Sequence, residues 1–177
     1  MKNIKNQDRK LEKPREKSAG FIVLKPDGDG DWRVLILRAA IYSKEGKLTG
    51  QVSKTWDIPK GHVEGRESDL DAATRETKEE TQFDIVPAMM AWGPQSFTVE
   101  QAKKDVSVFL CEWNADQDPV FLPGKMGFPE HSDFLWASWS LAYTNVYGAM
   151  KKGIVWSYSV THDCSEQEAL DKIIQGA

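Results

Sequence analysis

Three glutamates in one short segment have the spacing expected of a metal-binding helix face. Glu76, Glu79 and Glu80 occupy positions i, i+3 and i+4, which share one face of an α-helix. Carboxylates placed in this way repel one another by about 0.2–0.5 kcal/mol per pair. A helix that keeps them is expected to hold a cation, and Mg²⁺ prefers hard oxygen ligands of this kind. The alternative is a solvated acidic helix face, so the neighbouring residues must decide between the two.

The residues before the glutamates predict a loop that leads into the helix. Ser68 and Asp71 form a variant of the capping box, which predicts that the helix begins after Ser68. Gly61 lies in the preceding loop, where its backbone freedom lets a main-chain carbonyl join a ligand set. Arg75 is placed to reach back to Glu67 and to brace the loop against the helix. The segment therefore predicts a cradle that holds a divalent metal against a pyrophosphate.

The segment from residue 61 to residue 83 resembles the Nudix box, whose pattern is G-x5-E-x7-R-E-U-x-E-E-x-G-U, with U an apolar residue. The matching positions are Gly61, Glu67, Arg75, Glu76, Glu79, Glu80 and Phe83. Thr77 replaces the usual aliphatic residue, and Gln82 replaces the final glycine, which removes an easy left-handed end to the helix. No metal ligand is lost. The resemblance implies an α/β (α+β) Nudix fold, a mixed β-sheet sandwich flanked by α-helices, and a metal-dependent pyrophosphohydrolase.

Three further segments resemble the bis(5′-nucleosyl) tetraphosphatase branch of this family, whose members cut diadenosine tetraphosphate. They are PKGHV at residues 59–63, RET at residues 75–77 and EHSDFLW at residues 130–136. The RET variant is usual in that branch, so the departure at Thr77 is a branch trait. The likeness also implies that Glu130 lies across from the helix and contributes to the metal or base site.

The resemblance implies a role for each candidate residue. The implied metal ligands, for Mg²⁺ with Mn²⁺ as an alternative, are the Gly61 carbonyl and the carboxylates of Glu76, Glu79, Glu80 and Glu130. The implied catalytic residues are Glu76, Glu79 and Glu130, of which Glu76 or Glu130 takes the proton from the attacking water. The implied substrate contacts are Lys60, His62, Phe97, Lys103 and Lys104, and the implied supports of the box are Glu67 and Arg75. The alternatives for the substrate contacts are solvated lysines, a structural hydrogen bond of His62 and a core position of Phe97.

Charge separates an N-terminal arm from the rest of the chain. The 177 residues carry a formal net charge of −4. Residues 1–17 contain seven Lys/Arg and three Asp/Glu, so the balance from residue 18 onward is −8. We therefore expect a basic, disordered arm at residues 1–17 and a single domain at residues 18–177. An arm that gathers RNA or phosphate is the alternative.

The lack of a signal-peptide pattern and the presence of only two cysteines predict a reducing compartment. The arm has no apolar region of a signal peptide, and no stretch approaches 18 apolar residues, so we expect no membrane span. Cys111 and Cys164 are interpreted as reduced thiols. The expected location is cytoplasmic.

The remaining sequence predicts a mixture of strands and helices. Strands are expected at residues 21–24 and 34–37, paired antiparallel across a turn, and at residues 85–92, 96–99, 106–113 and 134–139. Residues 41–55 are polar and contain two glycines, which predicts a loop before a strand that enters Trp56. A helix is expected at residues 141–151 behind Ser140. A final helix is expected from a capping box at Ser165 to residue 174, with a stop at Gly176.

These expectations combine into a Mg²⁺-dependent Nudix hydrolase that cleaves a pyrophosphate bond of a small nucleotide, with diadenosine tetraphosphate as the first candidate. The alternatives are another nucleoside diphosphate derivative, the 5′ end of RNA, a diphosphoinositol phosphate and a non-catalytic ligand-binding module. The balance of −8 argues against a basic RNA channel outside the N-terminal arm. The presence of all four box glutamates argues against the non-catalytic module.

Overall fold

The computed structural model describes residues 15–99, 103–124 and 127–176. Most of the basic arm predicted at residues 1–17 therefore lies outside the described residues. Strand β1 (Glu16–Pro26) begins before residue 18, so the last two residues assigned to the arm belong to the sheet. The division into an arm and a single domain otherwise stays a prediction.

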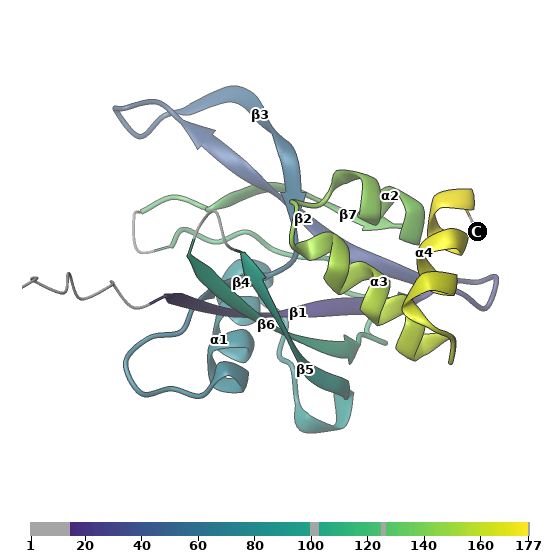
Figure 1. Cartoon of the computed structure of the whole chain (residues 1–177). Helices are drawn as coiled ribbons and strands as arrows, with labels where there is room; N and C mark the ends of the chain where they lie inside the picture. The colour runs from purple at the N-terminus through teal and green to yellow at the C-terminus, as the bar shows by residue number, and fades with distance from the viewer. Residues whose placement is uncertain (1–14, 100–102, 125–126, 177) are drawn as a thin grey trace, which may run out of the picture.

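A mixed β-sheet forms the centre of the molecule (Figure 1). Its other strands are β2 (Trp32–Tyr42), β3 (Leu48–Asp57), β4 (Lys60–His62), β5 (Met90–Val99), β6 (Lys104–Glu112) and β7 (His131–Ala137). The strand order is β3-β2-β1-β6-β5, with β4 paired to β1 and β7 paired to β2. β1 and β6 are parallel, whereas β1 and β2 are antiparallel. The predicted mixed sheet and its antiparallel first pair are confirmed.

Helices cover both faces of the sheet (Figure 1). Helix α1 (Asp69–Thr81) packs on one face. On the other face lie α2 (Trp139–Asn145), α3 (Met150–Thr161) and α4 (Glu166–Gln175). A short 3₁₀ helix, η1 (Pro87–Met89), precedes β5. This arrangement matches the predicted sheet flanked by helices.

The alternation of side chains along β1 explains why both faces are covered. Phe21 and Val23 are fully buried in the cluster beside α1, while Ile22 and Leu24 are fully buried in the cluster beside α2, α3 and α4. Successive side chains of a strand point to opposite faces, so an uninterrupted apolar strand needs a cover on each. Burial of each such side chain stabilises the fold by roughly 1.5–3 kcal/mol. β1 is therefore a firm support for β4, which pairs with it.

Helix ends follow the predicted capping signals at two positions. Capping boxes form at Ser68, before α1, and at Ser165, before α4. Gly176 ends α4 in the left-handed conformation, with φ of 83°. These local signals were correct because each depends on residues within one turn of the helix end.

The helix predicted at residues 141–151 was wrong. α2 ends at Asn145, and Val146 is extended, with φ of −70° and ψ of 154°. Val146 forms a bridge to Trp56 at the end of β3, and α3 starts only at Met150. A tertiary contact thus divides an apolar segment that reads as one helix.

Two predictions about strands were also wrong. The loop predicted at residues 41–55 contains the end of β2 and most of β3, which pair with each other. Most side chains of β3 are exposed, so no apolar periodicity marks it in the sequence. The strands predicted at residues 85–92 and 96–99 are one strand, β5, preceded by η1.

The expectations about membrane spans and cysteines can be compared with the structure. In the part of the chain that the structure describes, no helix has the length and apolar character needed to cross a membrane. Cys111 and Cys164 are free thiols, of which Cys111 is buried in the sheet. Burial raises the pKa of Cys111 above its ordinary value.

Candidate active site

The short strand β4 brings the loop before α1 against the helix carboxylates. β4 pairs with β1, with Lys60 opposite Gly20. A Cβ atom on Gly61 would overlap the carboxylate of Glu76, and a Cβ atom on Gly20 would overlap Lys60 and the Pro59 carbonyl oxygen. Close packing therefore requires glycine at both positions. The sequence did not reveal that Gly20 must be glycine, because this requirement arises only when β4 pairs with β1.

Caps and buried threonines fix the orientation of α1. Ser68 Oγ accepts a hydrogen bond from the Asp71 N–H at 3.1 Å and donates one to its carboxylate at 2.7 Å. Thr77 and Thr81 are buried on the inward face. Thr81 Oγ1 donates to the Thr77 carbonyl oxygen at 2.6 Å and accepts from the Phe83 N–H at 3.1 Å. With this face turned to the sheet, the glutamates are left on a face that borders the loop.

Helix α1 ends in a left-handed conformation although its last cap is not glycine. Gln82 has φ of 65°. Its backbone N–H and its side-chain amide both donate to the Lys78 carbonyl oxygen, each at 2.9 Å. The side-chain hydrogen bond offsets part of the cost of a left-handed non-glycine residue. The departure from the box at Gln82 therefore leaves the exit from the helix intact.

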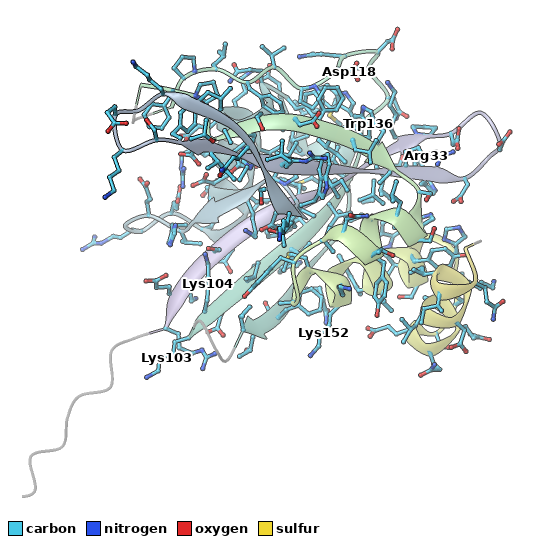
Figure 2. All side chains as sticks on the ribbon, turned by 90° about the horizontal axis from the view of Figure 1, so that it is seen from above. Arg33, Lys103, Lys104, Asp118, Trp136 and Lys152 are labelled. Atoms are coloured by element: carbon cyan, nitrogen blue, oxygen red, sulfur yellow. The ribbon has the colours of Figure 1, made fainter. Side chains whose placement is uncertain are left out.

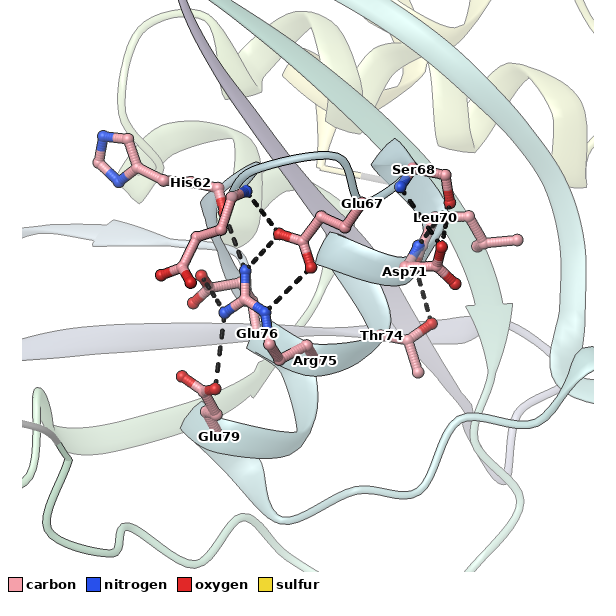
Figure 3. A network of polar contacts seen from close by, with 10 residues as sticks. His62, Glu67, Ser68, Leu70, Asp71, Thr74, Arg75, Glu76 and Glu79 are labelled. Atoms are coloured by element: carbon pink, nitrogen blue, oxygen red, sulfur yellow. Dashed lines mark hydrogen bonds and ion pairs between the residues drawn. The ribbon is translucent and has the colours of Figure 1, made fainter.

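Arg75 joins the loop to the helix (Figure 3). Its Nε donates to Glu67 Oε2 at 3.2 Å, and its Nη2 donates to Glu67 Oε1 at 2.7 Å. Nη2 also donates to the His62 carbonyl oxygen at 2.9 Å, and Nη1 donates to Glu76 Oε1 at 2.7 Å. These hydrogen bonds, above all those to Glu67, raise the pKa of Arg75 above its ordinary value despite partial burial. The guanidinium thus holds Glu76 beside β4, and Arg75 contacts Glu67 as the sequence predicts.

The glutamates of the helix face differ in their surroundings. Glu79 is half exposed, and its Oε1 lies 3.5 Å from Arg75 Nη1. Glu80 Oε2 accepts a hydrogen bond from the Lys60 N–H at 3.0 Å. Burial raises the pKa of both Glu76 and Glu80, and the negative charge of Glu130 adds to this rise in each case. The helix face therefore carries negative charge that its protein partners compensate only in part.

One cavity of about 360 Å³ receives these carboxylates. It is lined from α1 and β4 by Glu76, Glu79, Glu80 and Gly61, and by Glu130 from the residue before β7. The structure thus brings together all five residues that the sequence assigned to a metal. Their assembly depends on β7 pairing with β2, which places Glu130 beside a helix that lies far from it in the chain.

The donor groups of this cavity suit a hard divalent cation. Carboxylate oxygens and a main-chain carbonyl are the ligands that Mg²⁺ and Mn²⁺ prefer. A bound cation would also reverse the raised pKa values of Glu76 and Glu80, because it favours their ionised forms. Among the described residues, no three acidic, histidine or cysteine side chains already converge as a closed ligand group. The cavity nevertheless fits a hard divalent cation by the chemistry of its oxygen donors.

Two of the lysines predicted to contact substrate differ in position. Lys104 lines the cavity together with Lys60, whose Nζ lies 2.7 Å from Asp57 Oδ2. Burial, and then the charge of Lys60, lowers the pKa of Lys104. Lys103 lies in an exposed turn with φ of 48° and does not line the cavity. Figure 2 shows both Lys103 and Lys104 at the same end of the sheet. Two neighbouring ammonium groups, Lys60 and Lys104, are suited to contact phosphate oxygens.

The remaining predicted substrate contacts are His62 and Phe97. His62 lines the cavity at its rim, where its exposed Nε2 lies 3.4 Å from Glu16 Oε2. Phe97 packs against the core beside α2, α3 and α4, and a Cβ atom on Gly153 of α3 would lie 3.7 Å from its ring. Phe97 does not line the carboxylate cavity but packs on the face covered by α3, so its predicted contact with substrate stays a prediction.

His131 is a cavity residue that was not among the predicted site residues. It follows Glu130 and lines the same cavity. Burial, with a smaller effect of the Lys60 charge, lowers the pKa of His131 to about 4. Its Nδ1 is buried and has no hydrogen-bond partner among the described residues. A neutral imidazole therefore adds a polar group to this wall without adding positive charge.

A second cavity of about 290 Å³, which was not predicted, adjoins the first. Lys60 and Lys104 line both cavities. Other walls of the second cavity are formed by the apolar and aromatic side chains of Val99, Val106, Tyr147 and Met150. Tyr147 lies in the break between α2 and α3, which the prediction of one continuous helix concealed. Apolar surface thus lies directly beside two lysines that are suited to phosphate.

Comparisons with known proteins agree on one family. The family model described as NUDIX domain matches residues 14–156. Among solved structures, the chain is similar to an Ap4A hydrolase of C. elegans in a binary complex, at 23% identity and a TM-score of 0.60, over 82% of this chain and 98% of that chain. It is similar to a MutT protein from Methanosarcina mazei Go1, at 25% identity and a TM-score of 0.55, over 81% of this chain and 93% of that chain.

A third solved structure has the same fold at lower identity. It is the NUDIX domain of Shewanella oneidensis NrtR complexed with ADP ribose, at 14% identity and a TM-score of 0.60, over 88% of this chain and 94% of that chain. No curated protein sequence matches the chain. The structural likenesses establish the fold, and the family model covers the carboxylate cavity.

Proposed function

Because the chain belongs to the NUDIX domain family and is a pyrophosphohydrolase of that family, we propose that it cleaves a pyrophosphate bond of a nucleoside polyphosphate with Mg²⁺ as cofactor. The observation that carries this proposal is the junction of two cavities at Lys60 and Lys104. One cavity holds carboxylates, and the other offers apolar walls. A nucleotide has the same division, since an apolar base is joined to a charged phosphate chain.

The nucleoside occupies the cavity beside Tyr147, where an aromatic ring and apolar side chains replace water around the base. The phosphate chain then passes Lys60 and Lys104, whose ammonium groups bind its oxygens. This path leads to the carboxylates of α1. Lys60 is held by Asp57, so its position is fixed before substrate arrives.

The Gly61 carbonyl and the carboxylates of Glu76, Glu79, Glu80 and Glu130 would hold the cation. When bound, Mg²⁺ neutralises charge on the phosphate oxygens and lowers the pKa of a nearby water. The protein contributes position, because phosphoryl transfer depends mainly on alignment and charge stabilisation. Arg75 supplies that alignment by fixing both Glu67 and Glu76.

Glu130 is the better candidate for the residue that takes the proton from the attacking water. Glu76 accepts a hydrogen bond from Arg75 at 2.7 Å, so its oxygen is already engaged. Glu130 faces the same cavity from the opposite wall. A base on the wall opposite the ligand helix leaves room for water between them.

Diadenosine tetraphosphate is the first candidate substrate. The support is the likeness of residues 59–63, 75–77 and 130–136 to enzymes that cut it, together with two joined cavities. A single nucleoside cavity also suits another nucleoside diphosphate derivative such as ADP-ribose, which is therefore the second candidate. The two substrates differ in the group attached to the far end of the phosphate chain, which is a second nucleoside in one and a ribose in the other.

Steady-state kinetics on a panel of substrates tests the proposal. The panel contains diadenosine tetraphosphate, ADP-ribose, nucleoside triphosphates, capped RNA and a diphosphoinositol phosphate, each with Mg²⁺ and with EDTA. The expected result is the highest kcat/KM on a nucleoside polyphosphate, lost in EDTA. Protein carrying Glu80→Gln, purified in the same way, controls for contaminating hydrolases. Turnover of the diphosphoinositol phosphate alone, or activity that survives EDTA, would overturn the proposal.

A further inference from the structure

One wall of the carboxylate cavity is apolar, although the cavity otherwise presents charged groups. Phe121 and Leu122 line it together with Glu76 and Lys104. Leu122 is 49% exposed. Phosphate oxygens gain nothing from apolar side chains, because they need hydrogen bonds or cations in place of water. A substrate that ends in phosphate would therefore gain no favourable contact from this wall.

The apolar wall is held in position by the loop that carries it. The Val120 N–H donates to the Thr81 carbonyl oxygen at 3.0 Å, which ties the loop to the end of α1. The Phe121 ring packs edge-on against Phe134 of β7, with ring centroids 6.3 Å apart. Phe121 thus has a structural contact on one side while it borders the cavity on the other. Leu122 projects at the cavity from a backbone that is fixed on its N-terminal side.

The apolar wall and the Tyr147 cavity are separate surfaces. Phe121 and Leu122 line only the carboxylate cavity, and Tyr147 lines only the second cavity. The residues that line both are Lys60 and Lys104. A ligand that fills both cavities therefore has apolar contacts in each of them and passes the two lysines between the cavities.

We propose that Phe121 and Leu122 form a subsite for the second nucleoside of a dinucleoside polyphosphate, and this inference rests on the proposed function. One base lies in the Tyr147 cavity, and the phosphate chain crosses Lys60 and Lys104 to the carboxylates. The other base lies against Phe121 and Leu122, where apolar contact does not depend on the identity of the base. The wall thereby distinguishes substrates with a nucleoside at both ends from those with one.

The test compares two substrates of equal phosphate length, diadenosine tetraphosphate and adenosine 5′-tetraphosphate. The variant is Leu122→Ser, and the matched control is Val120→Ser. Val120 lies on the same loop and is similarly exposed, at 48%, but lines neither cavity. Both variants replace an exposed apolar side chain, and thermal melting verifies that each is folded.

We expect Leu122→Ser to reduce kcat/KM for diadenosine tetraphosphate about tenfold more than for adenosine 5′-tetraphosphate, mainly through KM. Val120→Ser should leave the ratio of the two kcat/KM values unchanged. Equal losses on both substrates in Leu122→Ser, or an equal change of the ratio in Val120→Ser, would overturn the subsite while the proposed function stands. Failure of the unaltered protein to cleave diadenosine tetraphosphate, while it still cleaves adenosine 5′-tetraphosphate, would overturn the subsite alone. Loss of activity on every nucleoside polyphosphate of the panel would overturn the proposed function as well.

Discussion

The two walls of the carboxylate cavity are held together in different ways. On the wall formed by residues 60–82, charged side chains bind one another and the main chain: Arg75 contacts Glu67 and Glu76, and Glu80 accepts from the Lys60 N–H. On the wall formed by residues 120–124 and 127–131, the main chain and ring packing supply the support, and a half-exposed leucine faces the cavity. The first wall holds charged groups at fixed positions, whereas the second wall presents an apolar surface.

This difference reflects the task of each wall. Charge stabilisation in phosphoryl transfer needs oxygen ligands at fixed positions, and a network of hydrogen bonds supplies that precision. Contact with a nucleobase needs an apolar surface, and small shifts of that surface cost little. Substitutions on the first wall should therefore have much larger effects on activity than substitutions on the second.

The largest effects are expected at the helix glutamates. Glu79→Gln and Glu80→Gln keep the side-chain shape and remove one negative charge, so each should lower Mg²⁺-dependent kcat by about 10²–10³-fold. The folded structure should persist, since Gln retains the acceptor oxygen that Glu80 presents to the Lys60 N–H. Stopped-time assays over a Mg²⁺ titration, with thermal melting of each variant, measure both quantities. Full activity in both variants would mean that the fixed charges do not bind the metal.

A smaller effect is expected from a substitution at Gly61, where β4 touches the Glu76 carboxylate of α1. Gly61→Ala places a methyl group against the Glu76 carboxylate, so the carboxylate must move away from β4. We expect kcat to fall about 10–100-fold, because a displacement of about 1 Å is enough for such a loss. Gly28→Ala is the matched control, since a Cβ atom there meets nothing within 4 Å. Equal activity of the two variants would show that the contact of Gly61 with Glu76 does not matter for the reaction.

The first wall was predictable from the sequence because its parts are close together in the chain. Glu67, Arg75 and Glu76 meet through the geometry of one helix and the loop before it. Ser68 and Asp71 mark the start of that helix within a single turn. The likeness of residues 130–136 to the bis(5′-nucleosyl) tetraphosphatase branch then added Glu130, which spacing alone does not connect to α1.

The second cavity was not predictable, because long-range contacts create it. Tyr147 is placed by the break between α2 and α3, and this break depends on the bridge of Val146 to Trp56. Phe97 packs on the face covered by α3, which its place in the sequence of β5 does not reveal. Neither a helical period nor a strand period records such contacts, so the sequence does not reveal this cavity.

The buried and only partly compensated carboxylates of the first wall predict that stability depends on pH and on Mg²⁺ together. Burial raises the pKa of Glu80 in the folded protein above its unfolded value. Without a cation, the folded state therefore binds more protons than the unfolded state between these two pKa values. Its stability is fully present below the unfolded pKa and falls as the pH rises through the folded pKa.

Melting curves measure this dependence. In EDTA, Tm should fall as the pH rises above the unfolded pKa of Glu80, and saturating Mg²⁺ should raise it by roughly 5 °C, more at the higher pH. Glu80→Gln removes the titrating group and should flatten the curve in EDTA. A Tm in EDTA that rises with pH over this range would contradict the assignment of buried, uncompensated carboxylates.

The smallest effect is expected from substitutions at Gln82, at the end of α1. Gln82 replaces the glycine of the Nudix box and does not line the cavity. Gln82 has φ of 65°, and its side-chain amide donates to the Lys78 carbonyl oxygen at 2.9 Å. Gln82→Ala keeps the left-handed conformation and loses this hydrogen bond, so the free energy of unfolding should fall by about 1 kcal/mol. Gln82→Gly also loses it but relieves about 1 kcal/mol of backbone strain, so its free energy of unfolding should stay within about 0.5 kcal/mol of the original. Urea denaturation measures both values, and equal destabilisation by Ala and Gly would show that the left-handed cap carries no strain. Activity should change in neither variant, because the hydrogen bonds between Arg75 and Glu67 hold the cavity residues in place and do not involve Gln82.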